Sequence, residues 1–510
     1  MIKHAYLKYA MALLMEENNL LKEDDVTFSH IKREINNGLD AFSVEPRENY
    51  IGKSEVKFGF VNKQNKASQF IFLSPNAIAT EMKASNLYKA AEKISKETPN
   101  IVLEKKDKVT QSQIPTVGEF CSFSDTGNIG RGKPEASNLD ICLGVITSTT
   151  PLKPCLQYMS GGNGKVTTDN VCLIPDLDIP NLIDFIKLFK RLRIQRLSDL
   201  MIGKVEIIKG KKNDTYKPKR PKLFNGNFPN APRSSALGAI ALLGAIGEMV
   251  KEQDVSKLAL RVLESFKGHN FYAFKYGDAK VFCFNHHIIN LAKKSHLRSV
   301  VDSLYDITLY NQSRNEKKSS QIEYQKFNLF ASRFLQLFNK PAFKDFLAFR
   351  AEYPGELEIL LKTYFIYMEH INQEIVQSAK ELGRWLNLVA YRVAKTEIQD
   401  NSKQDKEDLR KAKAKVLVEL ESSIFASKSA DALIAHTIAR AGRLSATDAP
   451  AEASLFMEKV VSGEVSLEQA KNLLIAFSRI KSTFYKDDAV TTENSEEVEN
   501  EKSDLDYSNI

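Results

Sequence analysis

The sequence predicts an α+β protein: a mixed N-terminal body with basic loops, a mainly helical middle segment, and a C-terminal bundle of four to five helices before a disordered acidic tail. Three observations predict this arrangement. Short strand-like runs and Gly-rich stretches share the first 235 residues, apolar steps of three and four continue after residue 367, and nine acids against one lysine fill residues 487–510. We therefore expect four parts, at 1–235, 236–366, 367–486 and 487–510.

The N-terminal body is expected to begin with a helix, because Tyr6, Tyr9, Ala10, Leu13 and Leu14 fall on one helical face. A second helix is expected at 182–200. Alternating or apolar runs predict strands at 56–61, 70–73, 141–146, 171–174 and 204–209, and Gly-rich loops are expected at 122–138 and 159–170.

The middle segment begins with the most apolar run of the chain, at 236–250. This run is too short to span a bilayer and carries Glu248 near its end, so we expect a buried helix. Gly277-Asp278 predicts a hairpin between strands at 271–276 and 280–284. In the bundle, Ser466 and Gln469 have the spacing of a capping box, and Trp385 is expected to anchor the core.

Positive charge is concentrated between Lys187 and Arg233, where fourteen Lys and Arg stand against three acids. Asn, Pro and Gly interleave there with Tyr216, Phe224 and Phe228, a composition that suits a phosphate backbone as partner. A solvated loop is the simpler alternative. The acidic tail serves solubility, or shields this basic surface in competition with nucleic acid.

The Gly-rich loops resemble phosphate-binding loops without matching them. Pro134 follows Gly132-Lys133, and Val166 follows Gly164-Lys165, at positions where a metal-binding hydroxyl belongs. We therefore expect no nucleotide hydrolysis. Such loops instead let backbone amides approach a duplex while Asn, Lys and Arg reach bases or phosphates, with ordinary hairpin turns as the alternative.

Neither a metal site nor a catalytic set is apparent. The five cysteines lack paired CxxC spacing, which favours reduced thiols and an intracellular, cytoplasmic protein. His286-His287 are expected to continue a strand and point to opposite faces, so that both cannot reach one ion. We expect no cofactor, no metal and no enzymatic activity, with distant acids converging into a nuclease or RNA-modifying site kept as an alternative.

The layout resembles the large subunit of the type I CRISPR surveillance complex Cascade, particularly its I-B and I-A forms. The familiar runs are NGNFPNAPRSS at 225–235, before the apolar helix, and LGRW at 382–385, opening the bundle. The resemblance implies a non-catalytic subunit that inspects duplex DNA for the protospacer-adjacent motif, helps open it, holds the displaced strand and recruits a helicase-nuclease.

The same resemblance implies further partners: the CRISPR RNA, the backbone and RNA-end-binding subunits, and the small subunit. It implies no membrane as a partner. The bundle is similar to that separate small subunit, so Met368 is a candidate internal start codon. A basic structural protein of a mobile element is a further alternative, which neighbouring genes would distinguish.

Site residues are chosen by chemistry. For reading the DNA motif we select Asn128, Arg131, Lys133, Asn163 and Lys165. For phosphate contacts we select Lys190, Arg191, Arg193, Lys209, Lys211, Lys212, Lys217, Lys219 and Arg220. Arg440 and Arg443 are the candidates for nucleic-acid contact on the bundle, with plain solvent exposure as the alternative.

Overall fold

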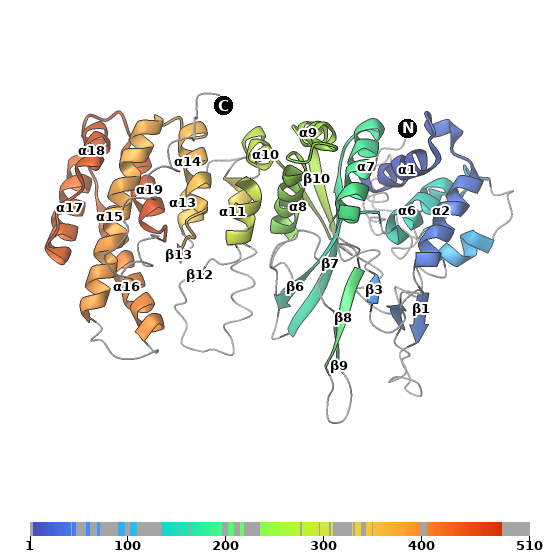
Figure 1. The fold of residues 1–510 in the computed structure, drawn as a ribbon, viewed down its shortest axis with the longest axis horizontal. Helices are drawn as coiled ribbons and strands as arrows, with labels where there is room; N and C mark the ends of the chain where they lie inside the picture. The colour runs from blue at the N-terminus through green and yellow to red at the C-terminus, as the bar shows by residue number, and fades with distance from the viewer. Residues whose placement is uncertain are drawn as a thin grey trace. The chain divides into compact units, whose positions relative to one another are not determined.

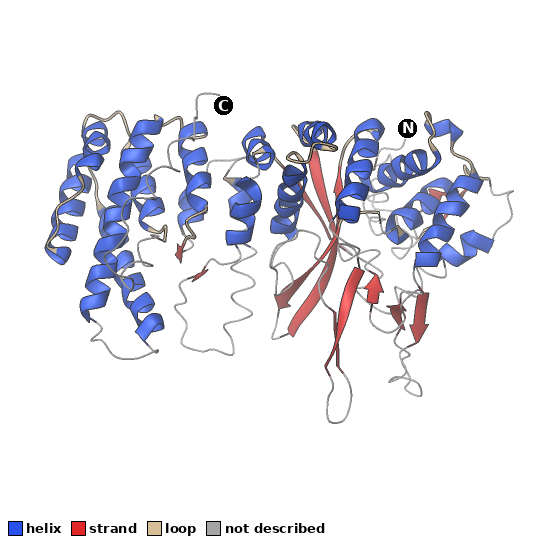
Figure 2. Ribbon diagram, in the orientation of Figure 1, coloured by secondary structure: helices blue, strands red, loops and turns tan. Residues whose placement is uncertain are grey.

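The computed structural model describes most of the helical part of the chain and the principal strands (Figures 1 and 2). The described residues are 4–41, 43–46, 58–61, 69–71, 90–96, 102–109, 135–150, 152–162, 165–195, 202–208, 215–218, 235–275, 278–294, 296–304, 308–309, 329, 332–337, 343–348, 350–397 and 405–481. They divide into two compact units. Unit 1 comprises residues 1–350 and 363–370, and unit 2 comprises residues 351–362 and 371–510.

Unit 1 mixes helices with small antiparallel sheets, as the predicted fold class requires. Its helices are α1 (Ala5–Asn18), α2 (Phe28–Ala41), α6 (Asn138–Thr149), α7 (Ile179–Gln195), α8 (Ser235–Met249), α9 (Ser256–Ser265), α10 (His286–Lys293), α11 (His296–Leu304) and α13 (Phe343–Leu347), with a 3-10 turn η1 (Glu23–Asp25). Its strands are β1 (Ser43–Pro46), β2 (Phe58–Val61), β3 (Gln69–Ile71), β4 (Lys106–Lys108), β5 (Glu135–Ser137), β6 (Cys155–Gly162), β7 (Lys165–Pro175), β8 (Ile202–Ile208), β9 (Thr215–Pro218), β10 (Asn270–Lys275), β11 (Asp278–Cys283) and β12 (Thr308–Leu309).

The largest sheet has the order β11-β10-β7-β6, with every neighbouring pair antiparallel. Side chains alternate along β10, so that its two faces carry different aromatic contacts. Phe274 stacks edge-on against Tyr6 of α1 on one face, and Phe271 packs against Phe266 on the other. Both faces are therefore covered, and the core of unit 1 lies on both sides of this sheet. The expected hairpin at Gly277-Asp278 is confirmed as β10–β11.

Residues 141–146 are helical, so the strand predicted there is wrong. They lie inside α6, whose N-terminus is capped by the Ser137 side chain accepting from the Asp140 amide. From Ile141 to Thr149 every residue is buried. A helix buried on all sides has no polar face, and its apolar run cannot be distinguished by periodicity from a buried strand.

The apolar run at 236–250 is the buried helix α8, as predicted. Within the described part of the chain, no helix has the length and apolar character needed to cross a membrane.

Unit 2 is a helical bundle. Its elements are β13 (Ala351–Glu352), the first part of α14 (Leu357–Tyr367), α15 (Gln373–Glu397), α16 (Asp405–Ala426), α17 (Ala430–Ser445), the 3-10 turn η4 (Ala451–Ala453), α18 (Ser454–Val461) and α19 (Leu467–Ser478). The capping box of Ser466 and Gln469 is confirmed at the start of α19. Trp385 is buried, and its indole Nε1 donates to Thr447 Oγ1 at 3.2 Å.

The central helix α15 approaches α19 closely at Gly383. A Cβ added there would lie 2.5 Å from the Cβ of Phe477, so only glycine lets the two backbones come this near. The segment before α14 also belongs to the bundle, because the Tyr353 amide donates to the Arg479 carbonyl at 2.7 Å and the Lys481 amide donates to the Tyr353 carbonyl at 2.8 Å. This short parallel bridge ties the entry of the unit to its last helix.

Candidate nucleic-acid interface

The most distinctive feature of unit 1 is a two-stranded ribbon formed by β6 and β7. Its ladder has eight rungs, from Cys155 opposite Cys172 to Gly162 opposite Lys165. Strand β10 pairs with β7 only from Cys172 to Pro175. Of the described strands, β6 alone therefore pairs with residues 165–171. This two-stranded part of the sheet extends about 23 Å beyond the last pair of β7 with β10, at ~3.3 Å per residue. Figure 1 shows the ribbon leaving the sheet.

Of the predicted motif-reading pair Asn163 and Lys165, the structure describes the backbone of Lys165, in the last rung of the ribbon. Lys165 is the first residue of β7, and the connection from Gly162 consists of Asn163 and Gly164, which lie outside the described residues. The loop predicted at 159–170 is therefore wrong for most of its length, since strands occupy it. The missed signal is Asn-Gly between strand-like runs, a pair typical of two-residue hairpin connections.

A second hairpin carries most of the predicted phosphate-binding lysines. Strands β8 and β9 pair from Val205 opposite Pro218 to Ile208 opposite Thr215. Lys217 lies in β9, opposite Glu206 in the register. The other lysines and the arginine fall just outside the described residues, in the connection at 209–214 or directly after β9: Lys209, Lys211, Lys212, Lys219 and Arg220.

The first Gly-rich loop, predicted at 122–138, is described only from Glu135 onward. Strands β4 and β5 bring Lys108 opposite Glu135, so residues 109–134 close on a short antiparallel base. Asn128, Arg131 and Lys133 lie outside the described residues. Their role as motif readers stays a prediction.

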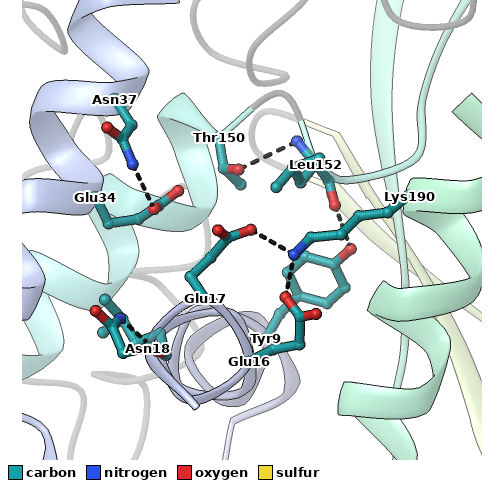
Figure 3. A network of polar contacts seen from close by, with 10 residues as sticks. Tyr9, Glu16, Glu17, Asn18, Glu34, Asn37, Thr150, Leu152 and Lys190 are labelled. Atoms are coloured by element: carbon teal, nitrogen blue, oxygen red, sulfur yellow. Dashed lines mark hydrogen bonds and ion pairs between the residues drawn. The ribbon is translucent and has the colours of Figure 1, made fainter. Parts of the chain in front are cut away.

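On α7, the predicted phosphate-binding residues have different surroundings. Lys190 forms ion pairs with Glu16 and with Glu17, the latter at 2.6 Å, so its charge is matched by two acids of α1 (Figure 3). Burial lowers the pKa of Lys190, but its hydrogen bonds to Glu16 and Glu17 outweigh burial and raise it overall. Arg191 is exposed, and Arg193 lies in the last turns of the helix. Lys190 therefore holds α1 and α7 together, and Arg191 is the exposed one of these two candidates for a phosphate contact.

Next to this ion pair lies a buried acid of α2, Glu34, which accepts a hydrogen bond from Asn37 at 3.2 Å. Burial raises the pKa of Glu34 to about 7. The Asn37 bond and the charges of Lys190 and Arg33 oppose this shift, and the charge of Glu17 adds to it. Figure 3 shows Glu34, Glu17 and Lys190 together between the helices. With this pKa, Glu34 is about half protonated at pH 7.

The two arginines predicted to contact nucleic acid on the bundle differ in whether an acid pairs with them. Arg440 forms an ion pair with Glu419 of α16. Arg443, one turn later on α17, is exposed and forms no ion pair with any described residue. Of the two, Arg443 is therefore available for a phosphate, whereas Arg440 would first leave its acid.

The paired histidines do not continue a strand, and the expectation that they point to opposite faces is wrong. Asn285 caps α10 by accepting from the amides of His287 and Ile288, so His286 and His287 begin a helix with ring centroids 3.7 Å apart. Burial, followed by the charges of His286 and His370, lowers the pKa of His287 to about 4. Across the described residues, no group of three or more His, Cys, Asp and Glu could hold a metal ion.

Comparison with known proteins gives one family. The family model described as CRISPR-associated protein Csp2 matches residues 4–481, which is nearly the whole chain. No curated protein matches the sequence. No solved structure matches it either. The match agrees with the resemblance to the large subunit of type I Cascade that the sequence indicates, and the chain belongs to the CRISPR-associated Csp2 family.

Proposed function

We propose that this chain is the non-catalytic large subunit of a type I CRISPR effector complex and that it reads the protospacer-adjacent motif with the β6–β7 ribbon. The observation that carries the proposal is the eight-rung ladder that leaves the sheet and ends at Gly162 opposite Lys165, in a chain of a CRISPR-associated family. The complex works in the cytoplasm, where its target DNA enters.

A ribbon of this kind has the dimensions of a groove reader. The major groove of B-DNA admits a two-stranded β-ribbon, and base edges exposed there differ in their donors and acceptors. An Asn amide pairs with adenine, and a Lys ammonium donates to guanine. Because the tip residues are Asn163 and Lys165, the ribbon presents both chemistries at its far end. Asn128, Arg131 and Lys133 on the first Gly-rich loop supply further contacts of the same kind.

Phosphate contacts position the ribbon on the duplex. The connection of the β8–β9 hairpin carries Lys209, Lys211 and Lys212, and Lys219 and Arg220 follow its second strand. These cations displace counterions from any DNA sequence, so they contribute affinity without selecting a motif. Arg191 on the exposed side of α7 adds to this set.

The subunit also helps open the duplex, holds the displaced strand and recruits the helicase-nuclease. Once the CRISPR RNA pairs with one strand, the displaced strand needs a cationic surface, which we assign to the face of the bundle around Arg443. The same unit offers the helicase-nuclease a docking surface next to the opened DNA.

The test is to assemble the effector complex with and without this chain and to measure its affinity for target duplexes with and without the correct motif. We expect omission to abolish the preference for the motif. An unchanged preference would contradict the proposal. Incubating the purified chain alone with DNA or RNA and Mg²⁺ or Mn²⁺ tests the enzymatic alternative, and metal-dependent cleavage would favour that alternative.

A further inference from the structure

At the base of the β6–β7 ribbon, the chain just before β6 and just after β7 is attached to adjacent residues of α1. The Tyr9 hydroxyl donates to the carbonyl of Leu152, just before β6, at 2.7 Å. Lys8 forms an ion pair with Asp176, the residue directly after β7. The two strands of the ribbon thus meet one helix at neighbouring positions.

On the β6 side, the donor of the attachment and the neighbouring Lys153 are buried. Tyr9 has none of its surface exposed, and Lys153, also fully buried, donates to the carbonyls of Ser148 at 3.0 Å and Thr150 at 2.7 Å at the end of α6. A buried ammonium without acceptors is strongly unfavourable, so these bonds fix the backbone before β6. The Leu173 amide donates to the Pro154 carbonyl at 2.9 Å, which joins the two strands at this base.

The helix α1 is itself held in place. Lys190 of α7 pairs with Glu16 and Glu17, and Tyr6 of α1 bonds to Ser148 of α6 through its hydroxyl at 2.8 Å. The base of the ribbon is therefore attached to a helix that is fixed at two further points, away from the sheet.

The length of the ribbon makes its base important. Because residues 165–171 pair only with β6 among the described strands, the tip follows any rotation at the base. A rotation of about 10° would move a tip ~23 Å away by about 4 Å, given ~3.3 Å per residue. Hydrogen bonds to a base edge do not survive such a displacement, because they require distances near 3 Å.

We infer that α1 sets the direction of the β6–β7 ribbon, with Tyr9 and Lys8 as positioning residues for the tip. The part that concerns DNA reading rests on the proposed function. The part that concerns ribbon geometry does not depend on it.

The geometric test uses the full chain with two spin labels introduced through non-natural amino acids at Thr168, on the ribbon, and Lys187, on the exposed side of α7. Tyr9→Phe removes only the hydroxyl. Lys8→Asp breaks the second attachment, and Lys8→Asp with Asp176→Lys restores it with the charges exchanged. Tyr6→Phe is the matched control, because it removes a buried hydroxyl of α1 that bonds to Ser148 of α6, while both attachments of the ribbon and the Lys190 ion pairs that hold α1 to α7 stay in place.

We expect one narrow distance distribution for the unaltered chain, for Tyr6→Phe and for the exchanged pair. Tyr9→Phe and Lys8→Asp should each broaden it while circular dichroism shows the helices intact. Unchanged distributions in both variants would overturn the inference. If Lys8→Asp fails to fold, Tyr9→Phe and the exchanged pair still decide the question.

The functional test measures the ratio of affinities for correct and incorrect motifs in the assembled complex. Tyr9→Phe should lower this ratio by about tenfold, the order that one base contact contributes. Affinity for DNA without the motif should stay unchanged. In a chain that already carries Asn163→Ala and Lys165→Ala, Tyr9→Phe should have no further effect. If the tip substitutions alone leave the ratio intact, the reading function fails, and the spin-label distances still decide the role of α1.

Discussion

Arg479 and Glu421 form a bidentate ion pair inside the bundle, with Nε to Oε1 at 2.6 Å and Nη2 to Oε2 at 2.8 Å. The two residues are 1% and 4% exposed, and Tyr353 accepts from Arg479 Nη1 at 3.3 Å. Burial alone would lower the pKa of Arg479, but Tyr353 and Glu421 raise it overall. The pair therefore stays charged, and it links α16, α19 and the segment before α14.

Removing one partner of this pair should destabilise the bundle strongly. Glu421→Gln leaves a buried guanidinium without its counter-charge, so we expect the free energy of unfolding to fall by about 3–5 kcal/mol. Trp385, the one tryptophan in the sequence, lies in this unit, so its fluorescence during chemical denaturation reports on it. Glu419→Gln, the control, breaks only the pair with the half-exposed Arg440 and should cost less than about 1 kcal/mol. Equal losses would contradict this account.

The bundle includes residues before Met368 that pair with its buried lysines. A product starting at Met368 would lack Glu352, which pairs with the buried Lys413 at 2.8 Å, and Glu358, which pairs with Lys380 at 2.6 Å. We expect residues 350–486 to unfold cooperatively as an isolated fragment. Residues 368–486 should not, because Lys413 and Lys380 would be buried without these acids. Thermal unfolding followed by circular dichroism compares the two fragments, and a cooperative transition for the shorter one would restore Met368 as a candidate start.

The buried Glu34 predicts a pH dependence. Its pKa is about 7 in the folded chain against an ordinary value of 4.5, so the folded state binds the proton more tightly. The stabilisation from this proton is full below about pH 4.5 and is lost as pH rises through 7, up to about 3 kcal/mol. Glu34→Gln should flatten this decline and raise the melting temperature at pH 8 to 9.

The control for Glu34 is Glu92→Gln, which removes an acid from a largely exposed pair with Lys96. It should leave the pH profile of thermal unfolding unchanged. A Glu34→Gln chain that lost stability with rising pH as steeply as the unaltered chain would show that Glu34 is ionised in the fold.

Arg443 and Arg440 should contribute unequally to holding the displaced strand. Arg443→Ala removes an exposed cation that has no ion pair among the described residues, whereas Arg440 is matched by Glu419. We expect Arg443→Ala to increase permanganate reactivity of displaced-strand thymines, and to reduce the salt dependence of single-strand binding by about 0.7 units. Arg440→Ala should change both quantities less. Equal effects would mean that the Glu419 pair opens on binding.

The sequence predicts local features better than long-range ones. The β10–β11 hairpin follows from Gly277-Asp278 and the start of α19 from Ser466 and Gln469, because the signals lie within a few residues. The apolar run at 141–146 was predicted as a strand, because α6 is buried on all sides and so shows no helical periodicity. The ribbon was missed although Asn163-Gly164 marks its turn.

In the candidate site, too, the sequence reveals residue types but not the contacts between distant positions. Asn163 and Lys165 were selected by residue type; the ladder places Lys165 in its last pair, opposite Gly162, whereas Asn163 lies outside the described residues. Lys190 was selected for its charge, yet its acid partners lie on α1, more than 170 residues earlier. An ion pair between such distant positions leaves no periodic or spacing pattern. The attachment of the ribbon to Tyr9 and Lys8 is a tertiary contact of the same kind, which a single sequence does not reveal.

The most direct test of the central claim is to measure the affinity of the assembled complex for a library of target duplexes that differ only in the motif. Asn163→Ala with Lys165→Ala should flatten the preference among motifs, at a cost of ~1–3 kcal/mol on the correct one. Lys211→Ala with Lys212→Ala should weaken binding to every duplex alike and lower the salt slope by about one unit per contact. An unchanged ranking of motifs after substitution at the tip would contradict the account.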